Sequence, residues 1–267
     1  MIYTINEYKK EDVPSLKALW SETFGDSAAL VDKFFELLPS MGMGLVAERS
    51  GEIFGAAYLI ETELWNSNGF SKKIGYIYAV AVEESERGNG LGAELVRACM
   101  RYAWENGIDI CCTLPAEPSL YNWYEKTSGL SVATYCVYDT VYPSDCDADI
   151  KEMYADEYGF ARSDILKGKS YVNPSYPYLL FQEAIFKEYG GAYYACGDGI
   201  ACGYIDGDTL YIKEALNDSP EFIPALCKKL GAQKAVVRRA SCSGVPYVCA
   251  YEAADFPTDT IWNLTLD

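Results

Sequence analysis

A glycine-rich turn between a strand pattern and a helix pattern constrains the fold of this chain more than any other stretch. The turn reads E-R-G-N-G-L-G-A over residues 86–93, and its glycines stand at alternate positions, Gly88, Gly90 and Gly92. Aromatic and β-branched side chains at 73–83 favour a strand before it. Apolar side chains recur at helical spacing directly after it. Such a turn leaves the N–H groups of a helix N-terminus free, and these groups typically bind phosphate.

Two well-known phosphate-binding motifs fit this turn poorly. The P-loop needs a lysine directly after its last glycine, and the chain has no lysine from residue 74 to 125. The dinucleotide fingerprint GxGxx[GA] is satisfied by Gly88, Gly90 and Ala93, but there the glycines should follow the strand at once. Here residues 83–87 separate the strand from the glycines, and the strand follows a hairpin pattern. Both motifs are therefore disfavoured.

The first 142 residues predict alternating helices and strands. Before the glycine turn we expect a strand at 2–7, helices at 10–24 and 27–38, hairpin strands at 44–48 and 53–64, and a strand at 73–83. After it we expect a helix to residue 106, a strand at 108–114, a helix at 118–127 and a strand at 132–142. Half of the 267 residues are hydrophobic, so the chain can bury a sizeable core. The predicted fold class is α/β (α+β).

An acidic segment at 143–157 separates two parts of the chain. Six acidic residues crowd this segment beside a proline and a serine. Such a change of composition is typical of a link between domains. We therefore predict a boundary near residue 145, with domains at 1–145 and 146–267.

The second part echoes the first. Residues 47–58 and 195–204 both read as strand, turn and strand. In the second part a strand at 209–214, a helix at 220–230 and a strand at 234–239 follow, which predicts an internal repeat. The stretch that matches the glycine turn, however, reads Asn217-Asp-Ser-Pro-Glu221. The carboxylates of Asp218 and Glu221 at a helix N-terminus would stabilise the helix dipole and repel a pyrophosphate.

Composition narrows the chemistry. The chain contains no histidine, so Ser-His-Asp and Cys-His catalysis are excluded, and acid–base work falls to carboxylates, tyrosine, lysine, cysteine or a terminus. A net charge of −17 makes nucleic acid a poor partner and favours a cationic small molecule. The ten cysteines form no CxxC pair, so we expect no metal and a reducing, cytoplasmic setting. No apolar run of membrane-spanning length and no secretory signal occur in the sequence, so we expect no membrane partner.

The spacing Val82-x-x-x-x-Arg87-x-x-Gly90-x-Gly92 resembles the acetyl-CoA motif of the GNAT (Gcn5-related N-acetyltransferase) superfamily, which also lies between a strand and a long helix. The order of elements over about residues 1–142 is similar to that family too. The resemblance implies a GNAT fold, with a mixed, mostly antiparallel central sheet flanked by helices. One acetyl-CoA would bind in the first half as acyl-donor cosubstrate. The second half would be a smaller, degenerate GNAT-like domain without a cofactor loop, as in tandem-GNAT proteins.

The resemblance also implies roles for individual residues. The strand 78–82 would hold the pantetheine arm through backbone groups, and an N–H near Val80 or Val82 would polarise the thioester carbonyl. The cofactor-binding residues would be Val80, Ala81, Val82, Arg87, Gly88, Asn89, Gly90, Leu91 and Gly92. Residues 113–126 resemble a late helix segment of the family, which places Tyr124 as the acid that protonates the leaving thiolate. The family often has an asparagine seven residues earlier, where this chain has Glu117.

The general base is open at this point. Glu61, Glu63 and Glu117 are candidates by their chain position. A further candidate is the carboxylate at the end of residues 261–267, which alternate like a strand. Tandem-GNAT enzymes of the enhanced intracellular survival type, which acetylate aminoglycosides, use a C-terminal carboxylate in this way.

The leading functional prediction is acetyl transfer from acetyl-CoA to a primary amine of a small molecule, for example a polyamine or an aminoglycoside-like compound. A catalytically inactive acyl-CoA-binding regulatory or scaffold protein is the first alternative. Transfer of another acyl group, or of an aminoacyl group, to a peptide N-terminus is the second. The sequence also leaves room for a homo-oligomer.

Overall fold

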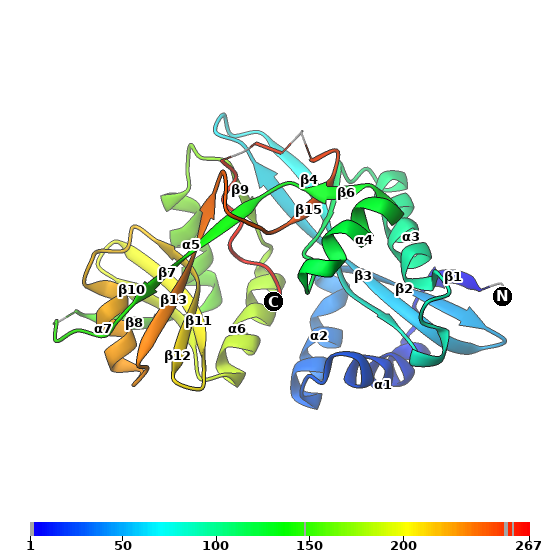
Figure 1. Cartoon of the computed structure of the whole chain (residues 1–267), viewed down its shortest axis with the longest axis horizontal. Coiled ribbons are helices and arrows are strands. Elements are labelled where there is room, and N and C mark those ends of the chain that lie inside the picture. Colours follow the sequence, from blue (N-terminus) through cyan, green and yellow to red (C-terminus); the bar gives the residue numbers. More distant parts are fainter. Residues whose placement is uncertain (1–2, 147, 254–255, 258) are drawn as a thin grey trace.

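The computed structural model describes residues 3–146, 148–253, 256–257 and 259–267. Two sheets lie side by side, and helices flank them (Figure 1). Most neighbouring strands in both sheets are antiparallel, so the architecture is the predicted mixed α/β fold class. Among the described residues, no helix is both long and apolar enough to cross a membrane.

The elements of the first half follow the predicted order. They are β1 (Thr4–Glu7), η1 (Lys10–Asp12), α1 (Val13–Phe24), α2 (Ala28–Met41), β2 (Gly42–Arg49), β3 (Glu52–Trp65), β4 (Ser71–Val82), η2 (Glu84–Glu86), α3 (Leu91–Glu105), β5 (Ile110–Thr113), α4 (Pro118–Ser128), β6 (Leu130–Val132) and β7 (Tyr135–Val141). Residue 2, where the first strand is predicted to begin, lies outside the described residues, as does Asp147 of the acidic segment.

The second half contains more elements than the sequence patterns predict. They are β8 (Ile150–Met153), α5 (Ala155–Ile165), β9 (Tyr171–Asn173), α6 (Tyr176–Glu188), β10 (Ala192–Cys196), β11 (Gly199–Asp206), β12 (Thr209–Leu216), α7 (Phe222–Lys229), β13 (Lys234–Ser241), β14 (Val245–Pro246) and β15 (Cys249–Tyr251). The hairpin β10–β11 and the series β12–α7–β13 lie where the predicted repeat places them.

Local chemistry explains where the helices of the first half begin and end. The Ser27 hydroxyl accepts a hydrogen bond from the Leu30 N–H at 3.2 Å and thereby caps the N-terminus of α2. Gly25 ends α1 in the left-handed conformation, with φ at +74°, which glycine adopts without steric cost. The short link between α1 and α2 thus turns the chain sharply, and Asp26 lies in it.

The two sheets repeat one strand order, and they exchange one strand. The first sheet runs β1-β2-β3-β4-β5-β15-β6, and the second runs β8-β10-β11-β12-β13-β7-β14. β4 is parallel to β5, as β12 is to β13, while the sixth position of each sheet is filled from the other half of the chain. β7 pairs with β13, and β15 lies between β5 and β6 (Figure 1).

This exchange corrects the strand predicted at 132–142. The segment forms β6 in one sheet and β7 in the other, because the N–H groups of Ala133 and Thr134 turn to the Val248 carbonyl at 2.8 and 3.2 Å. The boundary near residue 145 stays a prediction, since each part of the chain contributes a strand to the sheet formed mainly by the other part.

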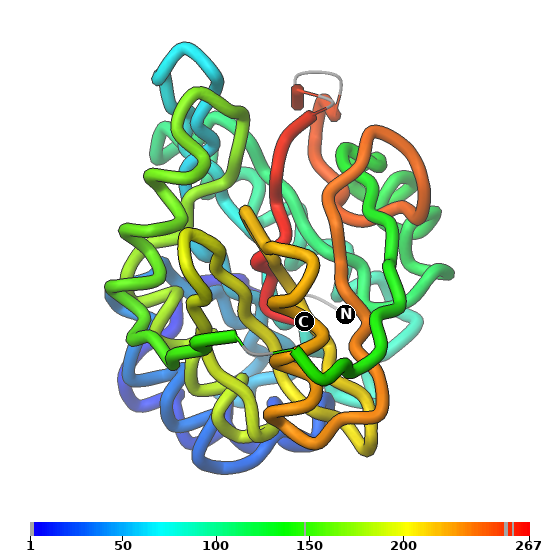
Figure 2. Tube along the Cα trace, turned by 90° about the vertical axis from the view of Figure 1, so that its left-hand side faces the viewer, coloured from blue at the N-terminus to red at the C-terminus, as the bar shows by residue number. Residues whose placement is uncertain are grey.

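The strand suggested by the alternation at 261–267 is also corrected. Within the described residues this segment makes only a single bridge, between Ile261 and Tyr171. It runs down the middle of the molecule to the C-terminus, where Figure 2 shows it in red. Its neighbouring residues are buried alike, with Trp262 at 2% and Asn263 at 4% exposure. The alternation therefore reflects an extended segment enclosed on all sides.

A shared apolar core joins the two halves. Trp262 of the C-terminal segment lies 5.7 Å from Tyr76 of β4 between ring centroids, and Phe181 of α6 lies 5.3 Å from Phe34 of α2. The helix α2 of the first half packs against α6 of the second half. Because these contacts are buried, they hold the two halves in one arrangement.

Candidate active site

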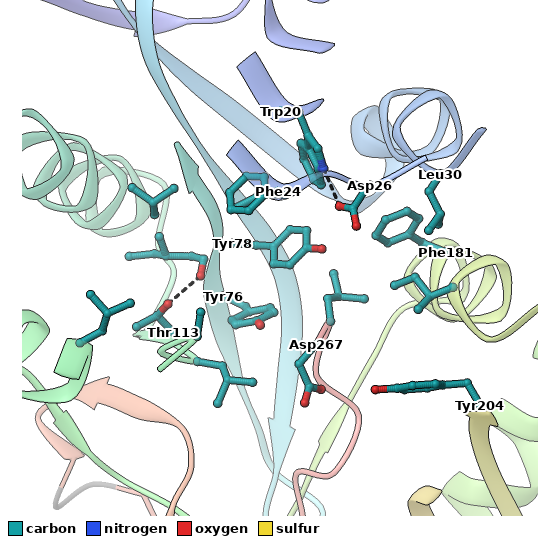
Figure 3. Close-up of a pocket in the computed structure, with 18 of the residues that line it drawn as sticks. Trp20, Phe24, Asp26, Leu30, Tyr76, Tyr78, Thr113, Phe181, Tyr204 and Asp267 are labelled. Atoms are coloured by element: carbon teal, nitrogen blue, oxygen red, sulfur yellow. Dashed lines mark hydrogen bonds between the residues drawn. The ribbon is translucent and has the colours of Figure 1, made fainter. Parts of the chain in front are cut away.

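The central feature of the site is the point where β4 leaves β5. The two strands pair from Ile74 with Ile110 as far as Ile77 with Thr113. The Thr113 hydroxyl donates a hydrogen bond to the Ile77 carbonyl at 2.9 Å and closes the paired part (Figure 3). β5 ends at this residue, whereas β4 continues to Val82. The backbone of β4 beyond Ile77 is therefore free to hold a ligand on the side that β5 has left.

A β-bulge in β4 causes the separation. Between the pairs Ala56–Ala81 and Tyr58–Tyr78 the register shifts by one residue, so two residues of β4 lie opposite one residue of β3. Ala79, one of the two, has a φ of +48°, which is rare for a residue with a side chain. A bulge bends and twists its strand, and here it turns β4 away from β5.

The predicted acetyl-CoA turn connects the end of β4 with the N-terminus of α3. Gly88 and Gly90 have φ values of +80° and +86°, so glycine is required there by backbone conformation. Gly90 is the N-cap residue and no side chain caps the helix, which leaves the first N–H groups of α3 available. Arg87 is exposed, and its Nε donates to the Val82 carbonyl at 2.9 Å. The turn thus combines free N–H donors with a guanidinium group.

Gly92 is different from these two glycines. It lies in the first turn of α3 with no positive φ, and a Cβ there would meet Val82 and Trp123 at 3.7 to 3.8 Å, an ordinary contact distance. Glycine inside a helix costs roughly 0.5–1 kcal/mol relative to alanine. Neither the backbone conformation nor the packing of the protein explains why glycine stands at this position. A ligand that approaches the helix backbone closely would require a residue without a side chain there.

A cavity of about 650 Å³ opens between the two halves at the point where β4 leaves β5. Residues of β4, including Tyr78, Ala79 and Val80, form one wall, and residues of α6, β11 and the C-terminal segment face them. Aromatic rings form much of the lining (Figure 3): Trp20, Phe24, Tyr76, Tyr78, Phe181 and Tyr204. The cavity is large enough for a small organic molecule, and both halves build it.

Three carboxylates line this cavity. Asp26 accepts a hydrogen bond from Trp20 Nε1 at 2.7 Å, and the side chain of Asp267 lies near Tyr204 (Figure 3). The third carboxylate is Asp206, at the exposed end of β11. Acidic side chains against aromatic walls suit a cationic ligand.

The Asp267 carboxylate is held by two cations of the second half. Lys213 Nζ lies at 2.9 Å and Arg238 Nη1 at 2.7 Å from the carboxylate, and the Thr265 hydroxyl donates to it at 2.6 Å. Burial alone would raise the pKa of Asp267, but the charges of Arg238 and Lys213 hold this pKa well below its usual range. The carboxylate therefore stays ionised at all physiological pH values and is a poor proton acceptor.

Tyr124 lies in the cavity wall, as the sequence predicts for a catalytic acid. Its side chain comes from α4 and is 7% exposed. Burial raises the pKa of Tyr124, and a hydrogen bond with Thr113 acts in the opposite direction. The phenol is therefore protonated at neutral pH and can donate a hydrogen bond into the region beside β4.

The carboxylates suggested from chain position lie elsewhere. Glu117 is exposed at the N-cap of α4, where its carboxylate accepts a hydrogen bond from the Ser119 hydroxyl at 2.6 Å. Glu61 and Glu63 are exposed on β3. Of the predicted site residues, Tyr124 and Val80 both line the cavity. Glu61, Glu63 and Glu117 are not among the described residues that line it.

Sequence patterns give little sign of the other lining residues. Asp26 follows the glycine that ends α1, and Asp206 is the last residue of β11, directly before a hairpin turn, where acidic residues are common. Their shared position at one cavity depends on how the two halves pack. Among the described residues, no cluster of cysteine, aspartate or glutamate side chains could hold a metal ion.

The second half repeats the separation of parallel strands, but its own chain fills the opening. β12 and β13 pair as far as Ile212 with Val237, and the extra residue of a bulge in β12 is Lys213. Lys213 and Arg238, the first residues beyond the paired part, both bind Asp267. At the position of the glycine turn, Arg239 binds the Asp218 carboxylate at 2.7 and 2.8 Å.

Comparison with known proteins agrees with this geometry. Residues 4–125 match a family model described as an acetyltransferase (GNAT) domain. A probable N-acyltransferase of unknown function from Enterococcus faecalis V583 has a similar fold, with 14% identity, a TM-score of 0.72, and coverage of 94% of this chain and 72% of that one. No curated protein matches the sequence significantly.

Two further solved structures share the fold. A GCN5-related N-acetyltransferase from Anabaena variabilis ATCC 29413 has 12% identity and a TM-score of 0.72, covering 93% of this chain and 72% of that one. Eis1 from Mycobacterium abscessus has 13% identity and a TM-score of 0.66, covering 94% of this chain and 74% of that one. At these identities the structures support a common fold over nearly the whole chain.

Substitution of Asp267 by asparagine should destabilise the protein in a pH-dependent way. At pH 7 we expect the free energy of unfolding to fall by about 2 kcal/mol, because the buried side chains of Lys213 and Arg238 lose their counter-ion. A lowered pKa in the folded state gives stability that is present above the ordinary aspartate pKa and is lost as pH falls through the folded value. Urea unfolding of both proteins from pH 7 to pH 2.5 should show the difference shrinking below about pH 4. An equal difference at every pH would contradict this assignment.

Proposed function

We propose that the protein transfers an acetyl group from acetyl-CoA directly to a primary amine of a small molecule, because residues 4–125 match a family model described as an acetyltransferase (GNAT) domain. The observation that carries this proposal is the continuity of the site. The glycine turn, the unpaired backbone of β4 and the cavity follow one another without interruption. A donor bound at the turn would extend along β4 and bring its thioester to the cavity.

The residues of the turn fit the donor's phosphates. Free N–H groups at the start of α3, the guanidinium group of Arg87 and the space left by Gly92 are suited to a pyrophosphate. The backbone of Val80, Ala81 and Val82 would hold the pantetheine arm. An N–H of the bulged segment would then donate to the thioester oxygen as negative charge develops there.

The cavity between the halves would bind the acceptor amine. The carboxylates of Asp26 and Asp206 and the aromatic walls would attract an ammonium group, whereas Lys213 and Arg238 already balance the charge of Asp267. Two lining carboxylates, Asp26 and Asp206, favour an acceptor with more than one positive charge, such as a polyamine or an aminoglycoside-like compound. The cavity position favours Asp26 over Glu117 as the carboxylate that contacts the amine.

The chemical step would be direct. The ammonium group first loses one proton to water, and the neutral nitrogen then forms a bond to the carbonyl carbon. The carbon–sulfur bond breaks, the nitrogen releases a second proton to water to give the amide, and the thiolate takes up one proton to give the free thiol. Tyr124 is placed to donate the hydrogen bond that stabilises this thiolate. We further infer that the second half is a GNAT-like unit that shapes the acceptor side and binds no donor, because its own chain fills the matching opening.

Calorimetric titration with acetyl-CoA tests the donor site. We expect one site per chain in the wild type and loss of binding in Arg87→Glu, since the substitution replaces a phosphate partner with a repelling charge. A panel of diamines, polyamines and monoamines at saturating acetyl-CoA should then show turnover, with the polyamines preferred. Donor binding without turnover of any amine would favour an inactive acyl-CoA-binding protein. A wild type that binds no acetyl-CoA would overturn the proposal.

Gly92→Ala should change stability and donor binding in opposite directions. We expect the free energy of unfolding to rise by about 0.5–1 kcal/mol, because alanine is the better helix former and the protein has room for its methyl group. The Kd for acetyl-CoA should rise about tenfold or more, because the methyl group would meet the bound phosphates. Parallel urea melts and calorimetry measure both quantities. Tighter or unchanged donor binding would show that Gly92 serves no ligand.

Tyr124→Phe should slow the chemical step and leave donor binding intact. We expect kcat to fall about 100-fold, which is the usual worth of a positioned proton donor. If the phenol must be protonated, activity is lost only as pH rises through its pKa, which burial raises above the ordinary value of about 10. The wild type should therefore show no fall in kcat from this group between pH 7 and pH 9.5. A kcat equal to that of the wild type would remove Tyr124 from the mechanism.

A further inference from the structure

A buried carboxylate lies directly behind the glycine turn, where negative charge should be unfavourable. Glu86 is the last residue of η2 and directly precedes Arg87, yet it is only 6% exposed although its neighbours on both sides are exposed. A carboxylate that faced the turn without a partner would repel the anion that this turn is built to bind. Its partners therefore decide what Glu86 does.

The partners of Glu86 come from β2 and from the residue just before β1, the first two strands of the first sheet. Arg49, at the end of β2, donates from Nη2 to the carboxylate at 2.9 Å. The hydroxyl of Tyr3, just before β1, donates to the other oxygen. Both oxygens of the carboxylate are thereby engaged, one by Arg49 and the other by Tyr3. One carboxylate thus ties the turn to two elements that lie far away in the sequence.

Arg49 is itself fixed in place. Its guanidinium group lies 4.3 Å from the ring centre of Phe54 and 5.2 Å from that of Tyr3. The backbone N–H of Glu83 donates a hydrogen bond to the Phe54 carbonyl at 2.9 Å. The residue before η2 is therefore anchored on β3, the strand that carries Phe54. Arg49 neutralises the carboxylate, and the stacked rings restrict the movement of the guanidinium group.

This anchoring addresses a specific weakness of a glycine turn. Glycine residues at positive φ give the turn its shape, but glycine also has more backbone freedom than any other residue. A loop that is loose before binding must lose that freedom on binding, which weakens affinity. The hydrogen bonds from Tyr3 and Arg49 to the Glu86 carboxylate fix the residue that directly precedes Arg87 and Gly88 before any ligand arrives.

We propose that Glu86, held by Tyr3 and Arg49, is a positioning residue that preorganises the glycine turn for the pyrophosphate of the acyl donor. This rests on the proposed function, because it assumes that the turn binds acetyl-CoA. Glu86 does not touch the donor in this arrangement. It acts through the backbone that it fixes at the start of the turn, and Arg49 balances its negative charge.

Calorimetry with acetyl-CoA tests the proposal on Glu86→Gln and Tyr3→Phe. Glutamine keeps the shape of the side chain but cannot accept both hydrogen bonds with full charge, so the Kd should rise about tenfold. Tyr3→Phe removes one hydroxyl and should raise the Kd about threefold. The matched control is Glu36→Gln, which breaks the exposed pair with Lys33 and should leave the Kd unchanged.

A donor without a pyrophosphate separates positioning from general loosening of the fold. S-acetylpantetheine carries the thioester and the arm but no phosphate, so its KM should be the same in Glu86→Gln and in the wild type. At saturating acetyl-CoA the kcat should also be unchanged, while the KM for acetyl-CoA rises. Equal losses with both donors would overturn the proposal, because they would mean a general structural role.

The outcomes also separate this inference from the proposed function. A wild type that binds acetyl-CoA, with Glu86→Gln binding equally well, would overturn the inference and leave the function standing. A wild type without binding would overturn the function itself. If a thermal melt shows that Glu86→Gln does not fold, Tyr3→Phe replaces it in the comparison of the two donors. A rise in KM for acetyl-CoA alone would then support the proposal, and an equal rise for both donors would overturn it.

Discussion

The separation of β4 from β5 is the feature on which the rest of the site depends. Two parallel strands would remain paired if both kept a regular pleat, and the bulge at Ala79 and Val80 ends that regularity. A positive φ at a residue with a side chain costs roughly 1–3 kcal/mol and persists only where the surroundings enforce it. Here the rings of Trp20 and Phe34 each lie 5.8 Å from that of Tyr78, next to the bulge. The packing of α1 and α2 thereby holds open the space in which chemistry can occur.

The exchange of β7 and β15 makes the cavity a property of the whole chain. Each sheet has its sixth strand from the other half, so neither sheet is complete without both parts of the sequence. The residues that face β4 across the cavity come from α6, β11 and the C-terminal segment. Their distance from β4 is fixed by the exchanged strands and by the buried contacts of Trp262 and Phe181. A catalytic surface on the first half is in this way given a fixed opposing wall.

The sequence reveals the parts of this arrangement that local chemistry determines. The glycine turn and the order of helices and strands in the first half follow from residue types within a few positions of one another, and the structure has them where they are predicted. The role of Tyr124 stays a prediction that the family resemblance implies. The exchange could not be predicted, because β15 has only three residues and gains its stability from β5 and β6 rather than from its own pattern. Asp26 and Asp206 escaped notice for the same reason. Each is ordinary in its local sequence, Asp26 between two helices and Asp206 at the end of a hairpin strand, and only tertiary packing brings both to one cavity.

The two strand separations show how one geometry can have opposite consequences. In the first half the bulge carries Ala79 and Val80, small or apolar residues that leave the backbone accessible beside the cavity. In the second half the bulge carries Lys213, and Arg238 stands opposite on β13, so two cations meet at the same position. Buried cations need an anion, and Asp267 supplies it from within the chain. The segment that closes the second opening therefore becomes a wall of the first, which explains why the same strand separation leaves a cavity in the first half and is filled by the chain in the second.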